Sequence, residues 1–384
     1  MTPPTLPFGP HYGFGLYLHW PYCTRICPYC DFNVYAAKDR DPGALIAAMS
    51  ADIQRHADRL KGHPPLTSLY FGGGTPSLMP PAEIEAMIAL ADRLFGLAPG
   101  AEITLEANPN DVSATSPSDW AAAGVTRLSL GIQSLDDDAL RFLGREHDSA
   151  GARTAVQRIA PVFDNFSIDL IYARPGQTEA EWQAELTAAL QLGAPHLSLY
   201  ELTIEERTAF GRRATRGELS PMLDDDQADL YELTQDITAA HGLPAYEVSN
   251  HASGPAYQSQ HNLIYWRGGD WIGIGPGAHG RISLDGQRIA TIAARKPAVY
   301  IAENTPPDEH LSALDAAREL LALGLRPLEG FDLARLAQLT GAMPPSDKIE
   351  DLVSAGLVTH SGSHIALTAS GRLLADRITM ELAP

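Results

Sequence analysis

The sequence predicts an α/β fold, in which a partial barrel of six β/α units precedes a smaller α+β C-terminal region with a winged-helix-like end. Three observations support this prediction. Six short apolar runs alternate with helical patterns as far as residue 215, at the spacing of βαβ units in a parallel sheet. The alternation then stops. After residue 330 the order becomes helix, helix, hairpin, helix. Six units fall short of the eight of a closed barrel, so the barrel should be open.

The six apolar runs are the expected barrel strands, and helical patterns lie between them. The expected strands are Gly15–Trp20, Ser68–Phe71, Glu102–Glu106, Arg127–Gly131, Phe166–Tyr172 and Leu197–Leu202. The expected helices are Pro42–Leu60, Ala82–Leu94, Ser118–Ala123, Ser149–Ile159 and Thr178–Leu192. A ligand cleft is expected at the carboxyl ends of these strands.

Four parts are expected along the chain. They are an N-terminal tail (1–14), the partial barrel (15–215), a helical and glycine-rich connecting region (216–330) and a winged-helix-like domain (331–384). Within the connecting region, Met222–His241 is expected to be one long helix opened by Asp224-Asp225-Asp226. Negative charge at a helix start complements the helix dipole, so the acidic run predicts a helix start and not a metal site.

The C-terminal part follows the order of a winged helix. Helices are expected at Asp332–Leu339, Ser346–Ala355 and Ala369–Leu382, with an apolar hairpin over Leu357–Leu367 that has Ser-Gly at its turn. From Phe331 onward, four Lys/Arg stand against six Asp/Glu. A wing that reads DNA is normally basic, so packing or partner docking is the expected role.

Composition narrows the function classes. The chain has 384 residues and a formal net charge of −19, which disfavours nucleic acid and anionic membrane surfaces as general partners. The sequence has no run of 18 apolar residues, so no transmembrane segment is predicted. The first ten residues have neither the basic start nor the apolar core of a signal peptide. Together with thiols that suit a reducing compartment, these features predict a cytoplasmic protein.

The three cysteines of the chain, Cys23, Cys27 and Cys30, form one Cys-x-x-x-Cys-x-x-Cys stretch. Three thiols are an odd number for disulfides and one short of a closed four-thiolate site. They suit an iron–sulfur cubane with one iron left open to a small molecule, since clusters ordinarily take four cysteines. The alternative is a zinc site completed by His19 or by a residue elsewhere, which the lack of a second cysteine pair disfavours. The ring of Tyr29 is expected to shield the cluster or simply to pack in the loop.

A glycine turn, Gly72-Gly73-Gly74-Thr75-Pro76, directly follows the second expected strand. Glycines allow backbone N–H groups to approach a ligand closely, and successive N–H groups can surround a carboxylate. Because the turn lies on the same rim as the cysteines, it is a candidate ligand site.

Polar residues mark the ends of the next strands. Glu106 ends the third strand, Gln133 and Arg145 follow the fourth, and Asp169 interrupts the apolar fifth. A carboxylate on a buried strand is costly without a partner, so Asp169 is expected either to bind a ligand or to pair with an arginine. All four residues lie on the cysteine rim, where barrel enzymes carry their functional groups.

A later segment combines a histidine with aromatic residues. His261, Tyr265 and Trp266 lie in the sequence His-Asn-Leu-Ile-Tyr-Trp, and the glycine-rich stretch Gly268–Gly280 follows. Such residues suit a flat apolar ligand with imidazole as an axial iron ligand. A single histidine beside Tyr and Trp is more often core packing, so the residues alone leave both interpretations open.

Together these motifs resemble the radical S-adenosylmethionine (SAM) superfamily. The match is strongest over Tyr17–Cys30, and Gly72–Pro76 and the rim residues extend it. The resemblance implies a [4Fe-4S] cluster on three thiolates, SAM bound to the open iron, and an electron donor such as a flavodoxin or ferredoxin. In such proteins the cofactor supplies the chemistry, and the protein orients and shields it.

Within the superfamily, the chain is similar over nearly its whole length to the oxygen-independent coproporphyrinogen III oxidase group. The oxidase branch has a further cysteine two residues after the third, where this chain has Phe32. It also has a longer N-terminal segment than the residues that precede Cys23 here. The stretch from His261 to Trp266, with Gly273–Gly280, resembles the haem-chaperone branch, HemW. The resemblance therefore favours a chaperone that binds haem and passes it to acceptor haemoproteins.

The resemblance also implies roles for single residues. The cluster ligands would be Cys23, Cys27 and Cys30, and the SAM contacts would be Tyr17, Tyr29, Gly73, Gly74, Thr75 and Glu106. Positions that serve a second SAM in the oxidase branch are Gln133, Arg145 and Asp169. The haem candidates are His261, Tyr265 and Trp266.

Two other functions stay open at this point. The first is a true enzyme that converts coproporphyrinogen III to protoporphyrinogen IX by radical oxidative decarboxylation. The second is a redox-inactive radical-SAM scaffold.

Overall fold

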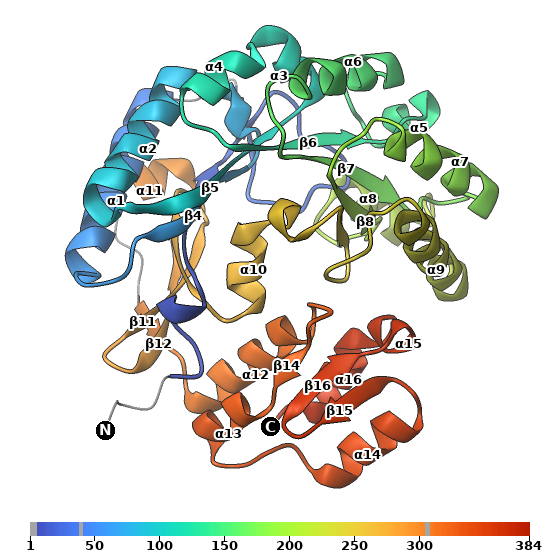
Figure 1. Cartoon of the computed structure of the whole chain (residues 1–384). Helices are drawn as coiled ribbons and strands as arrows, with labels where there is room; N and C mark the ends of the chain where they lie inside the picture. The colour runs from blue at the N-terminus through green and yellow to red at the C-terminus, as the bar shows by residue number, and fades with distance from the viewer. Residues whose placement is uncertain (1–5, 38–40, 304–307) are drawn as a thin grey trace.

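A single curved sheet of eleven strands forms the barrel part of the molecule (Figure 1). The computed structural model describes residues 6–37, 41–303 and 308–384. The strand order is β13-β12-β11-β10-β1-β4-β5-β6-β7-β8-β9. Its two end strands, β13 and β9, are not neighbours in this order. The barrel is therefore partial, and the predicted α/β fold class is confirmed.

All six predicted strands are present and run parallel to one another. They are β1 (Phe14–Trp20), β4 (Leu66–Gly73), β5 (Leu97–Ala107), β6 (Arg127–Gln133), β7 (Phe166–Tyr172) and β8 (His196–Glu201). Their buried side chains, such as Leu16, Leu69 and Leu128, belong to the main hydrophobic core. Because both faces of a parallel sheet are covered, its strands appear in the sequence as continuous apolar runs.

Helices cover the outer face of this sheet (Figure 1). The five predicted helices are confirmed, and two short helices, α3 and α5, are additional. The set is α1 (Pro42–Arg59), α2 (Pro81–Phe95), α3 (Pro109–Ala114), α4 (Pro117–Ala122), α5 (Asp137–Phe142), α6 (Ser149–Ile159) and α7 (Glu179–Leu190). The side chains of Asp41, Asp148 and Thr178 each accept a hydrogen bond from the backbone N–H three residues later. These caps fix the starts of α1, α6 and α7.

The expected connecting region differs most from its prediction, because it supplies five strands to the barrel sheet. β9 (Asn250–Ala252) pairs antiparallel with β8, and β10 (Asp270–Ile274) pairs parallel with β1. Beyond β10 lie β11 (His279–Leu284), β12 (Gln287–Ile292) and β13 (Asp308–His310). A Cβ atom on Gly273 would lie 2.2 Å from the His279 carbonyl oxygen. The glycines of this segment therefore permit close approach of strands, which corrects their interpretation as the lining of a flat ligand.

The helices of the same region are α8 (Ala209–Thr215), α9 (Asp224–Ala240), α10 (Gln260–Trp266) and α11 (Pro297–Glu303). The long helix expected at Met222–His241 is confirmed as α9, with three aspartates in its first turn. α10 lies on the concave side of the sheet, against β1 and β4 (Figure 1). This position places the histidine and aromatic motif inside the barrel.

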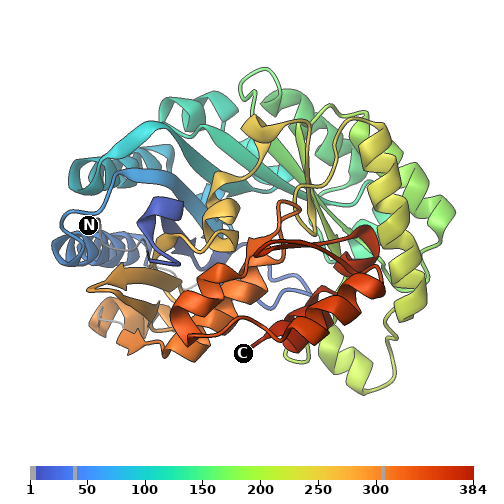
Figure 2. The ribbon, with the colours of Figure 1, turned by 60° about the horizontal axis from the view of Figure 1, so that its bottom comes forward.

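The C-terminal part has its own hydrophobic core and lies across one side of the barrel (Figure 2). Its small sheet has the order β14-β16-β15. The elements are α12 (Ala313–Gly324), β14 (Phe331–Asp332), α13 (Ala334–Thr340), α14 (Ser346–Ser354), β15 (Val358–Ser361), β16 (His364–Leu367), α15 (Ala369–Arg372) and α16 (Ala375–Leu382). The core includes Leu320 and Leu321 of α12, so it begins before the boundary expected at residue 331.

Two local predictions in this part need correction. The hairpin turn is Gly362-Ser363, one residue later than expected, because Ser361 pairs with His364. Gly362 has φ +64°, a conformation that glycine adopts at little cost in such a turn. The last helix is split into α15 and α16, which are separated by the exposed pair Leu373-Leu374.

The N-terminal residues that the structure describes pack against the body of the protein. Phe8 is buried, and Gly9 N donates a hydrogen bond to Gly268 O at 3.0 Å. The Arg335 guanidinium donates to Pro7 O at 2.6 Å and 2.8 Å. The expected tail is thus a docked segment from residue 6 on, and residues 1–5 lie outside the described part.

Among the described helices, none has the length and apolarity needed to cross a membrane.

Candidate functional site

The carboxyl ends of the parallel strands surround a cavity of about 480 Å³. All three cysteines line it, together with residues that end or follow β4, β5, β6, β7 and β8. Ligands of open α/β sheets and barrels bind at this end of the strands. The predicted cleft on the cysteine rim is therefore present.

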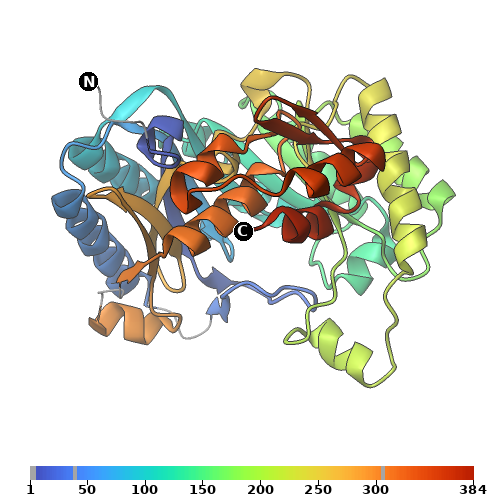
Figure 3. The same ribbon diagram turned by 90° about the horizontal axis from the view of Figure 1, so that it is seen from below.

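The cysteine loop is tied to distant parts of the chain. At its base, β2 (Tyr22–Cys23) pairs with β3 (Tyr35–Ala36). Phe210 N of α8 donates to Pro28 O at 2.9 Å. Asn33 Nδ2 donates to Pro276 O at 2.8 Å and to Arg295 O at 2.7 Å. Figure 3 shows this early segment, in blue, running along the lower side of the molecule toward α8. The loop is thus held at both ends.

Burial changes the acidity of the thiols. Cys23 is buried, and Cys27 and Cys30 are half-buried. Desolvation raises the pKa of Cys23, and it raises the pKa of Cys30 to about 11. Free Cys23 and Cys30 thiols are therefore protonated at neutral pH, and metal binding displaces their protons.

The donor set fits a cluster better than a single ion. Within the described part of the chain, no three His, Cys, Asp or Glu side chains are placed to hold one metal ion. His19 does not complete a zinc site, because its ring already bonds Tyr17 OH through Nδ1 (3.0 Å) and Asn33 O through Nε2 (3.0 Å). In a cubane each thiolate binds a different iron, so the three thiols need not converge on one point.

The glycine turn does not offer free N–H groups to an anion. Gly73 N donates to Glu106 Oε2 (3.1 Å), Gly74 N to Trp20 O (2.7 Å) and Thr75 N to Tyr22 O (2.9 Å). A Cβ atom on Gly74 would lie 3.0 Å from Cys23 Sγ. The glycines therefore allow the end of β4 to approach the cysteine loop, and the internal hydrogen bonds of these N–H groups do not support their predicted carboxylate-binding role.

Glu106 and Asp169 face the cavity from β5 and β7. Glu106 accepts hydrogen bonds from Tyr70 OH (2.9 Å) and Gly73 N, and burial raises its pKa to about 7. Asp169 accepts from Ser129 Oγ and Ser167 Oγ, each at 3.0 Å, and burial raises its pKa as well. The hydrogen-bond partners of Asp169 are thus hydroxyl groups, and the arginine considered as an alternative, Arg127, acts on it only through its charge.

Arg145 and Gln133 also line the cavity. Gln133 has φ +65°, a left-handed conformation that is uncommon outside functional sites and turns. Arg145 Nη1 donates to Cys27 Sγ at 3.4 Å, and Nη2 donates to Gly131 O at 2.9 Å and to Asn108 Oδ1. The Arg145 guanidinium therefore points at the cysteine loop and is largely committed.

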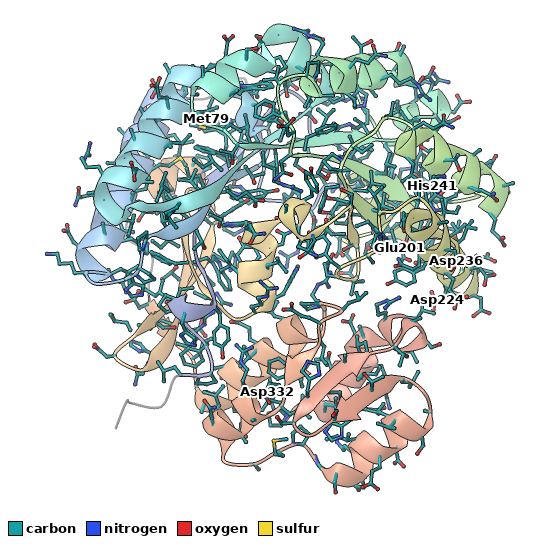
Figure 4. All side chains as sticks on the ribbon, viewed as in Figure 1. Met79, Glu201, Asp224, Asp236, His241 and Asp332 are labelled. Atoms are coloured by element: carbon teal, nitrogen blue, oxygen red, sulfur yellow. The ribbon has the colours of Figure 1, made fainter. Side chains whose placement is uncertain are left out.

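Acidic residues outnumber basic ones on the cavity wall. The wall carries three arginines and seven carboxylates, namely Arg25, Arg127, Arg145, Asp31, Glu106, Asp111, Glu146, Asp169, Glu201 and Glu205. Arg127 is committed, since its Nη1 donates to Asn165 Oδ1 and Tyr257 O. The acidic residues Asp224 and Asp236 of α9 lie at the periphery of the molecule and add nothing to the cavity (Figure 4). The wall suits a cationic ligand.

The two tyrosines predicted near the ligand differ in position. Tyr29 lines the cavity and packs on Phe210 with 6.5 Å between ring centroids. Tyr17 does not line the cavity, because its hydroxyl is bonded to His19 on the α10 side of β1. The expected contact of Tyr17 with SAM is therefore not supported by its position.

The histidine of α10 is sealed inside the protein. His261 is 1% exposed and does not line the cavity. Its Nδ1 is 2.6 Å from Ser68 Oγ and its Nε2 is 2.6 Å from Tyr265 OH, while the ring stacks on Tyr70 at 5.0 Å. Burial lowers the pKa of His261 to about 3. Trp266 is covered by the Arg326 guanidinium at 4.6 Å. This arrangement does not support haem ligation by His261, because both ring nitrogens already have partners.

Several cavity residues were missed by the sequence analysis. Asn108 follows β5 directly and precedes Pro109, and Ser129, Ser198 and Tyr200 lie within strands. Asn108 occupies a strand end, the signal that identified Glu106 and Gln133. The others alternate with buried apolar residues, so only the curvature of the sheet shows that they face the cavity.

Comparisons with known proteins agree with this geometry. The radical SAM superfamily model matches residues 17–188, and the HemN C-terminal domain model matches residues 311–374. The chain is 37% identical to haem chaperone HemW of Mycobacterium tuberculosis over 379 residues, which cover 96% of this chain and 94% of the relative. Identity with haem chaperone HemW of Escherichia coli is 34% over 372 residues, or 95% and 96% of the two chains.

A solved structure extends the agreement to the fold. Coproporphyrinogen III oxidase (HemN) of Escherichia coli superimposes with a TM-score of 0.79 over 97% of this chain and 90% of that chain, at 21% sequence identity. At this identity the likeness concerns the fold alone.

The partial barrel, the three-cysteine loop on its rim and the matching domain model define a radical SAM protein. Identity above 30% over nearly the full length narrows this class further. The chain belongs to the HemW family of haem chaperones.

Proposed function

We propose that this chain binds haem and transfers it to acceptor haemoproteins, and that its barrel holds a [4Fe-4S] cluster and SAM. The observation that carries the proposal is the near full-length similarity to relatives named as haem chaperones in Mycobacterium tuberculosis, Escherichia coli and Bacillus subtilis. The similarity spans both the barrel and the C-terminal part, so it concerns the whole arrangement and not the cysteine motif alone.

In this proposal the cluster is bound by Cys23, Cys27 and Cys30. Bound together, the cluster and SAM supply one-electron chemistry through the open iron. The acidic wall supports a cationic ligand such as SAM, with its sulfonium and ammonium groups. Since the N–H groups of Gly73, Gly74 and Thr75 are used internally, this turn would meet SAM through its oxygen atoms, which accept hydrogen bonds from an ammonium group.

The remaining SAM contacts follow from positions around the cavity. Glu106 would accept from the ribose hydroxyls, and Tyr29 would contribute its backbone and cover the cluster. Asp169, Gln133 and Arg145 face the same cavity, and whether they serve a second SAM is a separate proposal.

The acidic wall argues against the oxidase alternative. Coproporphyrinogen III carries four carboxylates, and their binding requires cationic or N–H donors. Of the three wall arginines, Arg127 and Arg145 are committed to internal hydrogen bonds, and Arg25 is exposed at the mouth. A tetracarboxylate would thus meet carboxylates in the interior. A chaperone that keeps haem outside this cavity avoids that repulsion.

We propose that haem binds at the α10 motif, with His261, Tyr265 and Trp266. This binding requires a local rearrangement of the side chains around His261. His261 becomes available to iron only if its bonds to Ser68 and Tyr265 break. Haem docking elsewhere, with His261 as a purely structural residue, is the competing possibility, and the His261→Ala variant separates the two.

A haem titration followed by the Soret band tests the chaperone proposal. We expect saturable binding by the purified protein at micromolar haem, and transfer of the bound haem to an apo-haemoprotein. Absence of saturable binding would contradict the proposal.

Anaerobic incubation with coproporphyrinogen III, SAM and a reductant is the complementary assay, and formation of protoporphyrinogen IX would establish the oxidase function instead.

Two further parts of the proposal concern its setting. Reduction of the cluster would need an electron donor such as a flavodoxin or ferredoxin, and unpaired metal-binding thiols suit a reducing compartment such as the cytoplasm.

The redox-inactive scaffold is the remaining alternative. It predicts that reconstituted protein shows no electron paramagnetic resonance (EPR) signal of a reduced cluster after dithionite is added.

A further inference from the structure

A chain of hydrogen bonds runs from Cys27 along the cavity wall to Thr75. Arg145 Nη1 donates to Cys27 Sγ at 3.4 Å, and its Nη2 donates to Asn108 Oδ1. Asn108 Nδ2 donates to Thr75 Oγ1 at 3.4 Å. Thr75 also lowers the pKa of the Cys23 thiol, which burial raises overall. Three side chains from the loops after β6, β5 and β4 thus form one hydrogen-bonded chain that reaches Cys27.

The direction of every bond in this chain is set by its middle member, Asn108. Asp111 Oδ2 accepts from both Asn108 N (3.1 Å) and Asn108 Nδ2 (3.3 Å). The carboxylate therefore holds the amide with its NH₂ group toward Thr75 and its oxygen toward Arg145. At its other end, this orientation leaves the Arg145 guanidinium to donate a hydrogen bond to Cys27 sulfur.

The donor to Cys27 is a strong one. The Arg145 guanidinium brings a full positive charge to the sulfur at 3.4 Å and is anchored on Gly131 O at 2.9 Å. At Cys30 the Phe32 backbone lowers the pKa of the thiol, although burial raises it more.

We propose that Arg145, positioned by Asn108, raises the reduction potential of the cluster held by the three cysteines. The inference rests on the cluster put forward under the proposed function. Reduction adds one electron to the cluster and makes no bond, so it increases the negative charge on the cluster sulfurs. Hydrogen bonds to these sulfurs stabilise the reduced state. Asn108 acts as a positioning residue, because it touches Arg145 and Thr75 but no cysteine.

Redox titration of reconstituted full-length protein with dithionite, followed by EPR of the reduced cluster, tests this proposal. At the wild-type midpoint potential we expect Arg145→Met to lower the ratio of reduced to oxidised cluster about tenfold, which equals about 59 mV for one electron. The Arg145→Lys variant keeps the positive charge but loses the forked guanidinium, so its ratio of reduced to oxidised cluster should fall between those of the wild type and Arg145→Met. Asn108→Ala should lower the ratio about threefold, because Arg145 keeps its carbonyl anchor.

Asn110→Ala is the matched control, since Asn110 lines the same cavity two residues away and is not part of the chain. Its midpoint should equal that of the wild type. Equal midpoints for wild type, Arg145→Met and Asn108→Ala, at equal iron content, would overturn the inference. If Arg145→Met fails to fold, Arg145→Lys and Asn108→Ala still decide the question.

Failure of this inference is distinguishable from failure of the proposed function. A wild-type protein that takes up no iron, or binds no haem in the Soret titration, contradicts the proposed function. A wild-type protein that passes both tests, with variants that show no shift, contradicts only the role of Arg145 and Asn108.

Discussion

The sequence indicated both the cysteine loop and helix α10 as cofactor sites, but the structure leaves the first accessible to a ligand and buries the second. The thiols of Cys23, Cys27 and Cys30 line an open cavity. His261 is 1% exposed, and both of its ring nitrogens have hydrogen-bond partners. Residue type and spacing thus indicate which chemistry a motif can support. Access to a ligand depends on what the rest of the chain packs over it.

Loss of one thiol should give the largest effect on the cysteine side of this comparison. Cys30→Ser removes one of three ligands from a site that has no spare thiol. We expect the reconstituted variant to hold almost no iron or sulfide per chain, while His261→Ala holds as much as the wild type. Iron and sulfide assays with the visible spectrum measure this. Equal cluster loss in both variants would show that the two regions are coupled.

Truncation of the sealed histidine should mainly affect stability. His261→Ala leaves a cavity and removes the partners of the Ser68 and Tyr265 hydroxyls. We expect the free energy of unfolding of the apoprotein to fall by about 3–5 kcal/mol. Denaturant titration measures this, with Ser68→Ala as a milder control at about 1 kcal/mol. Unchanged stability together with a lost Soret band would instead assign His261 to haem.

Glu106 should make the stability of the cavity depend on pH. Burial raises its pKa from 4.5 to about 7. The folded state therefore holds this proton more tightly than the unfolded state, and the resulting stabilisation is lost as pH rises from about 4.5 through about 7. The loss is at most about 3 kcal/mol. Glu106→Gln should flatten this part of the pH profile, as measured by apoprotein denaturation between pH 5 and 8. Tyr70 and Asp169 face position 106 in both proteins, so the two profiles should differ only through the Glu106 carboxyl. Parallel profiles would therefore contradict the assignment of this pH dependence to Glu106.

The smallest effect is expected at Phe32, although this residue separated the two branches in the sequence analysis. Its side chain is 65% exposed at the cavity mouth. Phe32→Ala should change the free energy of unfolding by less than about 0.5 kcal/mol and leave the iron content unchanged. A drop in iron content would mean that the Phe32 ring protects the cluster from solvent.

The sequence was sufficient to predict the repetitive part of the fold. The six β/α units were found because strands buried on both faces, such as Phe166–Tyr172, appear as uninterrupted apolar runs. Strands β9 and β10 were missed, because both are short and because the glycine of β10, Gly273, reflects close strand packing. Without the partner strand in view, glycine for packing and glycine for a ligand look alike.

Site prediction succeeded where residues end strands and failed where a partner comes from far away. Glu106 and Asp169 were found from their positions on strands and do face the cavity. His261 and Ser68 lie 193 residues apart in the sequence, so the hydrogen bond between them could not be inferred from the motif. The position of Asn108 at a strand end could have been found, but its hydrogen bonds to Thr75 and Arg145 could not, because these residues come from other loops.

The hydrogen bond from Asn33 to Pro276 has a consequence for the order of events during biosynthesis. It closes the cysteine loop onto a segment made 243 residues later, and β1 likewise gains β10 as a neighbour only at that stage. At about 5–20 residues per second, the ribosome needs on the order of tens of seconds to cover this gap. During that time β1 has one unpaired edge. We therefore expect iron to be loaded onto the finished chain after its release, and not onto the nascent chain.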